Sequence, residues 1–236
     1  MSHTKDKIYA LVQDIAHEAR ALRSCDHSNI QSLIGVAPFE DSLALISPWM
    51  QQGDLSKLIY QPDSGLSSKD RYTLSIQIAD SVSYLHNLNI LHVDIKSSNV
   101  LLSSDLKPKL ADFGSAMMNE VSTEHRNIVA SLHWAPPEFA MRRQPSPGWD
   151  VHSLGMTIFE IFAGCMPYDG IQRNTVQAHI ILRKLPGRPQ NRLPVGDRQC
   201  DRLWELLLKC WAQDPLCRPT ASEVRDELKL ISEISC

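Results

Sequence analysis

The chain has 236 residues and a formal net charge of −3, with 43% hydrophobic and 22% charged residues. This is the composition of an ordinary globular protein, and the length suits one large domain or two small lobes. The near-neutral charge gives no reason to expect binding to nucleic acid or to an anionic membrane surface.

No apolar run reaches the ~18 residues that a transmembrane helix needs. The polar start of the chain is not followed by the apolar core of a secretory signal. We therefore expect no membrane association and a cytoplasmic location, with the nucleus as an alternative. The six cysteines form no C-x-x-C pair, so their spacing does not predict a zinc site.

Helical periodicity and capping residues predict most of the secondary structure. The first helix is expected at residues 7–24, with Thr4 as its cap. Two strand-like runs follow at residues 33–36 and 43–47, joined by a charged turn at residues 40–41. Further helices are predicted at residues 54–60, 68–87, 149–163, 175–182, 197–212 and 220–232. The last helix begins with a capping box formed by Thr220 and Glu223.

The stretch between residues 90 and 114 contains the residues best suited to chemistry. It predicts two short strands, residues 100–102 and 106–110, joined by a turn. The loops beside these strands contain Asp94, Lys96, Asn99 and Asp112. Carboxylates, an amide and a cation are the groups that phosphoryl transfer needs, because its catalysis is mainly positioning and charge neutralisation. Carboxylate and amide oxygens also suit a hard ion such as Mg²⁺.

The strings HVDIKSSN and DFG in this stretch resemble two loops of protein kinases, which have the patterns H-R-D-L-x-x-x-N and D-F-G. The resemblance implies that Asp94 accepts or orients the substrate hydroxyl proton and that Lys96 meets the γ-phosphate of ATP. It implies that Asn99 and Asp112 hold Mg²⁺. Lys96 is typical of the serine/threonine class. An isolated Asp-x-Lys is usually a solvated loop pair, but the whole ordered string argues against that alternative.

Val93 stands where such kinases usually have an arginine before the catalytic aspartate. That arginine ordinarily pairs with a phosphate on the activation segment, and valine cannot, so this form of switching is not expected. Hydroxyl groups that could be phosphorylated follow Gly114, at Ser115, Ser122, Thr123 and Ser131. Ser131 also resembles the residue of the substrate-facing loop that hydrogen-bonds the catalytic aspartate and lysine.

Residues 17–36 resemble the kinase αC helix and the strand after it. By that match Glu18 is the αC glutamate that contributes to the ATP site, which pairs in the family with an upstream lysine. A surface glutamate is the alternative. The Gly-rich loop and the V-A-I-K lysine of the family do not precede it. The seventeen residues before Glu18 contain no glycine, and Lys5 and Lys7 do not fit the lysine's position. We therefore expect a shortened upper lobe.

The run SPWMQQGDL resembles the kinase hinge that binds adenine. Ser47 would be a small gatekeeper residue. The carbonyl of Pro48 would accept from the adenine amino group, although proline has no N–H. The backbone of Met50 would supply the other contacts. A generic turn containing Pro48 and Gly53 is the alternative.

Three further residues resemble structural residues of the family. Glu138 stands where the family has the glutamate of A-P-E, and Arg218 would be its partner in a buried ion pair. Asp150 resembles the aspartate that holds the backbone of the catalytic loop, and a plain helix N-cap is the alternative for it.

The resemblance covers residues 18–231 and implies an α+β, N-terminally truncated protein kinase domain of the tyrosine-kinase-like serine/threonine group. We expect one domain over residues 1–236. Residues 1–50 would form a partial upper lobe with the hinge, and residues 51–236 a mainly α-helical lower lobe. The implied activity is signalling by ATP- and Mg²⁺-dependent phosphorylation of a protein substrate. The alternatives are a pseudokinase-like binding module and a fragment of a longer kinase.

Overall fold

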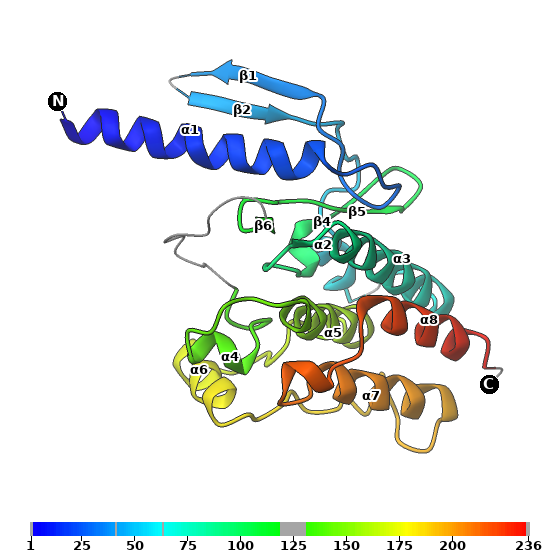
Figure 1. The fold of residues 1–236 in the computed structure, drawn as a ribbon. Helices are drawn as coiled ribbons and strands as arrows, with labels where there is room; N and C mark the ends of the chain where they lie inside the picture. Colours follow the sequence, from blue (N-terminus) through cyan, green and yellow to red (C-terminus); the bar gives the residue numbers. More distant parts are fainter. Residues whose placement is uncertain (1, 41, 63, 119–130, 235–236) are drawn as a thin grey trace.

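The computed structural model describes residues 2–40, 42–62, 64–118 and 131–234 (Figure 1). Helix α1 (Ser2–Arg23) lies against a two-stranded ribbon of β1 (Gly35–Phe39) and β2 (Ser42–Ile46). A larger, mainly helical body lies below them, with three short strand pairs in the whole described structure. This arrangement fits the predicted α+β class with a small upper part.

Helix α1 begins at Ser2, five residues before the predicted start at residue 7, so Thr4 lies inside the helix and does not cap it. No glycine or proline occurs before Gly35, and nothing in this sequence therefore interrupts the helix early. Its small and apolar residues Val12, Ile15, Ala16 and Ala19 line an open groove of about 660 Å³ beneath the ribbon.

The ribbon differs from the predicted strands in its bounds. Strand β1 begins at Gly35, two residues later than predicted, and pairs antiparallel with β2 from Gly35↔Ile46 to Phe39↔Ser42. Leu33 packs against the core from the preceding loop, so its apolar side chain indicated a buried position and not a strand. Pro38 lies inside β1, a position that an edge strand tolerates. The predicted turn contains Glu40 in a left-handed conformation, with φ of 51°.

A short hairpin ties the upper and lower parts together. Strand β4 (Val100–Leu102) pairs with β5 (Pro108–Leu110) in the register Val100↔Leu110, as predicted. Strand β5 begins two residues late because Leu106, with φ of 59°, still belongs to the turn. Ile30 bridges to Leu110 and Asp54 bridges to Leu101. The two segments that leave the ribbon therefore both attach to this hairpin. The pair of β3 (Ile90–Leu91) and β6 (Met117–Met118) was not predicted.

All predicted helices of the lower part are present, with ends within two residues of the prediction. They are α2 (Leu55–Ile59), α3 (Ser68–Asn87), α5 (Pro147–Ala163), α6 (Arg173–Ile181), α7 (Arg198–Cys210) and α8 (Ala221–Ser232). The capping box of Thr220 and Glu223 is present. Helix α4 (Pro137–Ala140) and the 3₁₀ turns η1 (Ser97–Asn99) and η2 (Pro215–Cys217) were not predicted.

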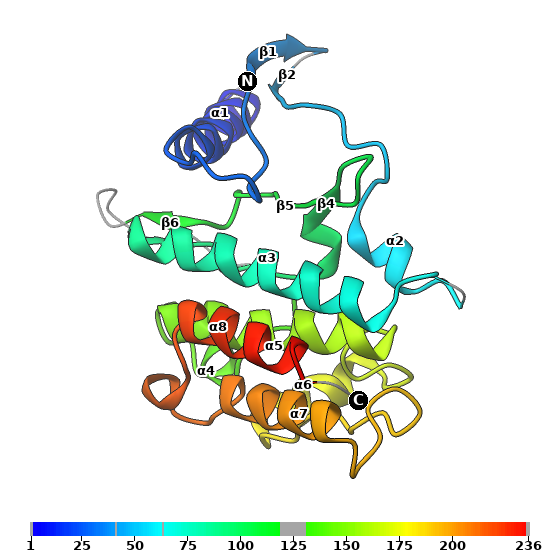
Figure 2. The ribbon, with the colours of Figure 1, turned by 90° about the vertical axis from the view of Figure 1, so that its right-hand side faces the viewer.

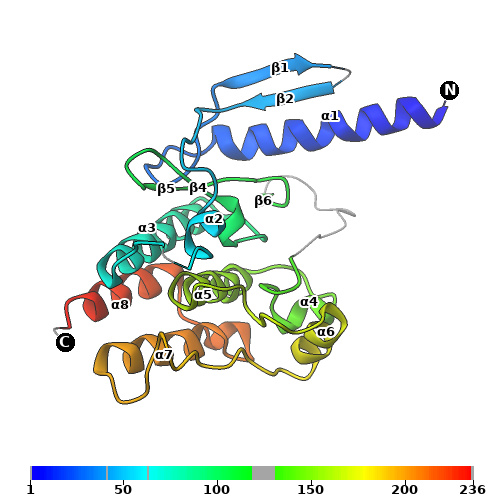
Figure 3. The same cartoon turned by 180° about the vertical axis from the view of Figure 1, so that it is seen from behind.

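Helix α5 is the centre of the lower part. All fourteen of its residues from Trp149 to Phe162 are buried, so the helix is covered on every side. Helix α3 lies above α5 and packs against α8, which lies beside α5, and α7 packs below α5 (Figures 2 and 3). None of the helices in the described ranges is long and apolar enough to cross a membrane.

Candidate active site

The structure gathers the predicted catalytic residues around the carboxylate of Asp94. Lys96 Nζ lies 2.6 Å from Asp94 Oδ2 and 2.6 Å from the hydroxyl oxygen of Ser131. The N–H of Ser131 donates to Asp94 Oδ1 at 3.1 Å. Asn99 Nδ2 donates to Asp94 Oδ2 at 3.1 Å and to its backbone carbonyl at 2.9 Å. The predicted contacts of Ser131 with the aspartate and the lysine are therefore present.

These contacts favour the ionised form of Asp94 and leave its carboxylate one lone-pair site for a further hydrogen-bond donor. Burial raises its pKa, but the hydrogen bonds from Lys96 and Ser131 outweigh burial, so the pKa lies below the usual value for an aspartate. A carboxylate offers about four lone-pair sites, and three of them accept from Lys96 Nζ, Asn99 Nδ2 and the backbone N–H of Ser131. The remaining site suits a hydroxyl donor.

Asn99 and Asp112 are brought close by the β4–β5 hairpin, because the N–H of Ala111 donates to the carbonyl of Asn99 at 2.9 Å. Both amide protons of Asn99 point at Asp94, so its Oδ1 is left as an acceptor. Oδ1 of Asn99 and the carboxylate of Asp112 are hard oxygen donors that fit Mg²⁺. Two protein ligands are enough when phosphate oxygens supply others. No cluster of three or more metal-binding side chains occurs in the described ranges.

Glu18 meets the backbone after Asp112 and not a lysine. The N–H of Phe113 donates to Glu18 Oε1 at 3.2 Å. Burial raises the pKa of Glu18, and the charge of Asp112 raises it further, although the bond from Phe113 opposes both. No ion pair to Glu18 forms within the described residues. The neighbouring His17, which the sequence did not single out, holds the carbonyl of Ala116 at 2.6 Å through Nε2.

The predicted hinge leads from the end of β2 to α2. Ser47 is half-buried. The carbonyl of Pro48 accepts from Gln31 Nε2 at 2.8 Å, a contact that the sequence did not reveal. The carbonyl of Met50 accepts from the N–H of Gly53 at 3.2 Å, and Gly53 has φ of 70°. The hinge therefore contains a turn at residues 50–53, which includes Gly53 but not Pro48 of the alternative, and both of the expected acceptors already have protein donors.

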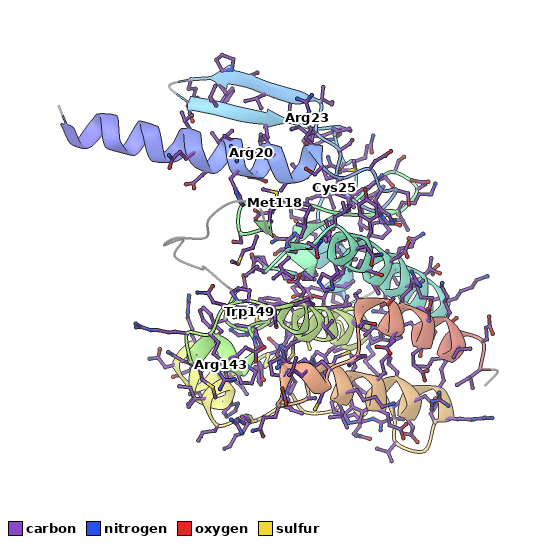
Figure 4. The ribbon with its side chains drawn as sticks, in the orientation of Figure 1. Arg20, Arg23, Cys25, Met118, Arg143 and Trp149 are labelled. Carbon is purple, nitrogen blue, oxygen red and sulfur yellow. The ribbon has the colours of Figure 1, made fainter. Side chains whose placement is uncertain are left out.

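Asp150 holds the backbone of the catalytic loop, as the resemblance implied. It is fully buried and accepts from the N–H of His92 at 2.9 Å and from the N–H of Val93 at 2.8 Å. Trp149, labelled in Figure 4 at the start of α5, donates from Nε1 to the carbonyl of Val93 at 3.2 Å. The N-cap alternative is wrong, because Ser146 is at the N-cap position of α5 and Asp150 lies in the first turn.

Glu138 and Arg218 form the predicted buried ion pair. Arg218 donates to both carboxylate oxygens of Glu138, at 2.6 and 2.8 Å. It also donates to the carbonyls of Ala212 and Gly148, at 2.9 and 2.8 Å. Glu138 is 4% and Arg218 is 7% exposed, so every charge in this cluster depends on these partners.

A third buried carboxylate, Glu160, was not predicted. Glu160, on α5, is fully buried and accepts from the side chains of Tyr60, Ser97 and Trp134. Burial raises its pKa although these hydrogen bonds oppose the rise. The signal was a lone glutamate inside the apolar run Ile158 to Phe162, because a buried acid needs partners. It links α2, the catalytic loop and the segment before α4.

His152 makes the stability of the fold depend on pH. Its ring is buried beside Arg218, with Nδ1 3.3 Å from the carbonyl of Trp134. Burial, and then the charge of Arg218, lowers its pKa to about 3. Between pH ~6.5 and pH 3 the unfolded chain binds a proton there that the folded chain does not. We therefore expect stability to fall as the pH drops through this range, by at most ~1.4 kcal/mol per pH unit from this group.

Melting temperatures of the wild type and His152→Asn between pH 7 and pH 5 would measure this effect. The wild type should lose stability faster than the variant as the pH falls. His179→Asn, at a half-buried position on α6, controls for the loss of an imidazole and should follow the wild type. Parallel curves for the wild type and His152→Asn would contradict the assignment.

Ser122 and Thr123, two of the candidate phosphorylation sites, lie outside the described residues. Ser115 and Ser131 lie within them, and the hydroxyl of Ser131 is already held by Lys96.

Comparison with known proteins agrees with this geometry. A sequence model of the family described as "Protein tyrosine and serine/threonine kinase" matches residues 2–228. A probable serine/threonine-protein kinase of Dictyostelium discoideum is 30% identical, over 95% of this chain and 24% of its own length. The serine/threonine/tyrosine-protein kinase HT1 of Arabidopsis thaliana is 26% identical, over 94% of this chain and 56% of its own. Mitogen-activated protein kinase kinase kinase 2 of the same plant is 29% identical, over 94% and 34%.

The chain thus spans between about a quarter and just over half of the length of these relatives. The regions of this chain that match these relatives cover 94–95% of it. The helical lower part, the small strand pairs and the loop of Asp94 are the fold of the matched family.

Proposed function

The chain belongs to the family of protein tyrosine and serine/threonine kinases, and we propose that it transfers the γ-phosphoryl group of ATP to a serine or threonine hydroxyl of a protein substrate. The observation that supports this most directly is the cluster of Asp94, Lys96 and Ser131. Lys96 lies 2.6 Å from both the Asp94 carboxylate and the Ser131 hydroxyl, and lysine at this place is typical of the serine/threonine class.

The hydrogen bonds of the site suggest a role for each of its residues. Asp94 orients the substrate hydroxyl and takes its proton through the free lone pair of its carboxylate. Lys96 is held by Asp94 and Ser131 where it can face the transferred phosphoryl group. Asn99 and Asp112 would hold Mg²⁺, which neutralises charge on the phosphates when bound. Asp150 and Trp149 fix the loop backbone, so the geometry exists before substrate arrives.

A non-catalytic binding module is the second candidate, and Glu18 is the observation that favours it. Phosphate positioning in the family uses a lysine paired with this glutamate. Within the described residues Glu18 instead bonds the N–H of Phe113 and has its pKa raised by burial and by Asp112. A site without that cation would hold the triphosphate less firmly. Signalling, a cytoplasmic location and the division at residue 50 stay predictions.

Thermal unfolding with and without Mg²⁺-ATP separates the two candidates. A ligand at 100 times its Kd adds ~2.7 kcal/mol to the unfolding free energy, which corresponds to a rise in Tm of roughly 5–11 °C for a chain of this size. We expect a rise in this range for the wild type and none for Asp112→Asn.

Asp105→Asn is the matched control, because Asp105 lies in the exposed turn of the same hairpin and pairs with Lys107. It should keep the full rise in Tm. Transfer of labelled phosphate to serine or threonine of a generic protein substrate would then establish the reaction. No rise in Tm at millimolar Mg²⁺-ATP would favour the binding module.

A further inference from the structure

Gln31 occupies an unusual position between the hinge and the magnesium loop. Its N–H donates to the carbonyl of Leu110 at 2.9 Å, two residues before Asp112. Its side-chain Nε2 donates to the carbonyl of Pro48 at 2.8 Å. Gln31 is only 5% exposed. Gln31 therefore connects two parts of the site: its backbone bonds strand β5, which leads to Asp112, and its side chain bonds the hinge.

The chemistry of Pro48 fixes the direction in which this carboxamide points. Proline has no N–H, so Pro48 offers only an acceptor, and only the NH₂ side of Gln31 can satisfy it. Oε1 of Gln31 then faces the other way. It is buried and receives no hydrogen bond in the described structure, which is an unfavourable state for a polar atom. The contact with Pro48 is held despite that cost.

The donor that reaches Pro48 resembles the group that a nucleotide would bring. The Watson–Crick edge of adenine places an amino donor beside a ring nitrogen acceptor, and a carboxamide places an NH₂ donor beside a carbonyl acceptor. The Pro48 carbonyl is thus already bound by an adenine-like donor. The N–H of Met50, by contrast, has no acceptor among the described residues, so it stays open to a ring nitrogen.

We propose that Gln31 determines nucleotide specificity by competing for the Pro48 carbonyl, so that the hinge binds a purine with little selection for its 6-amino group. This inference rests on the proposed ATP-binding function. The wild type should bind through the Met50 N–H, which a purine lacking the amino group also satisfies. Removing the carboxamide would free the Pro48 carbonyl, and selection for adenine would appear.

The test compares the Kd of ATP with that of purine riboside triphosphate, which lacks only the 6-amino group, by titration calorimetry with Mg²⁺. For the wild type we expect the two values to agree within about twofold. For Gln31→Val we expect ATP to bind roughly 2- to 10-fold more tightly than the analogue, the range of one net hydrogen bond. Gln52→Val, in the hinge but with an exposed side chain, should behave as the wild type.

Each other outcome would overturn the inference. A wild type that already prefers ATP more than fivefold would show that the Pro48 carbonyl is free for the amino group, and this result needs no variant to fold. Equal ratios for the wild type and Gln31→Val would show that the carboxamide does not select. If Gln52→Val gains the preference as well, the effect is not specific to Gln31. If neither nucleotide binds the wild type, the proposed function fails together with the inference, which distinguishes that failure from the others.

Discussion

Replacing Arg218 with leucine is expected to lower the melting temperature by roughly 6–20 °C. The guanidinium holds both oxygens of Glu138 at 2.6 and 2.8 Å, and both residues are buried. Without Arg218 the carboxylate of Glu138 is left as an uncompensated buried charge, which costs ~3–5 kcal/mol. For a chain of 236 residues each kcal/mol changes Tm by roughly 2–4 °C. Thermal unfolding followed by circular dichroism measures the change.

Arg202→Leu is the matched control for this prediction. Arg202 also pairs with a glutamate, Glu227, but its side chain is 45% exposed, and surface pairs contribute only ~0–1 kcal/mol. Its Tm should stay close to that of the wild type. If both variants lost the same amount, burial of the Glu138 pair would not be what stabilises this region. The double variant Glu138→Gln with Arg218→Leu should recover part of the loss, because it removes the orphaned charge.

Replacing Asp94 with asparagine is expected to reduce kcat for phosphoryl transfer by about 10²- to 10⁴-fold, the usual contribution of a general base. Asparagine keeps the size of the side chain and can still accept from Lys96, but it cannot take the proton of the substrate hydroxyl. The loss should fall on kcat and not on KM, since Asp94 acts on the transferred group and not on nucleotide binding. Initial rates at varied ATP concentration would separate the two.

Asp54→Asn provides a close comparison. Its side chain is 17% exposed against 12% for Asp94, and it too is paired with a lysine, Lys57, at 3.0 Å. Asp54 caps α2, a role that asparagine fills equally well, so both kcat and Tm should stay unchanged. If the Asp94→Asn variant kept more than a tenth of the wild-type kcat, the assignment of Asp94 as the general base would be wrong.

The sequence predicted the parts of the site that local chemistry and spacing define. The hairpin over residues 100–110 follows from its apolar runs and turn, and it is what brings Asn99 and Asp112 together. The helix over residues 68–87 was predicted with its observed ends from the apolar residues that recur on one of its faces. The structure adds a capping box of Ser67 and Asp70 at its start. The partnership of Glu138 and Arg218, eighty residues apart, came from resemblance alone.

Contacts that depend on tertiary placement could not be predicted. Gln31 lies in a loop, and only the fold brings its side chain to the Pro48 carbonyl. His17 reaches Ala116 across ninety-nine residues, and neither residue carries a pattern that predicts the contact. Helix α1 began earlier than expected because apolar periodicity marks the buried part of a helix, whereas the polar residues before residue 7 continue it without burial signals. Among the missed residues, Glu160 was the one with a signal in the sequence, because it is a charged residue inside an apolar run.

Val93 connects the folding of this chain with its proposed catalytic function. It is a β-branched residue with φ of 70°, a conformation that costs roughly 1–2 kcal/mol for an L-residue. The carboxylate of Asp150 accepts from the N–H of Val93 and the indole of Trp149 donates to the Val93 carbonyl, so both neighbouring peptide units are held. The free-energy cost of this conformation arises when the chain folds, and substrate binding would not add to it. If the chain catalyses the proposed phosphoryl transfer, this rigidity would contribute to its rate through entropy, because the orientational freedom of Asp94, the next residue, is already removed before substrate binds.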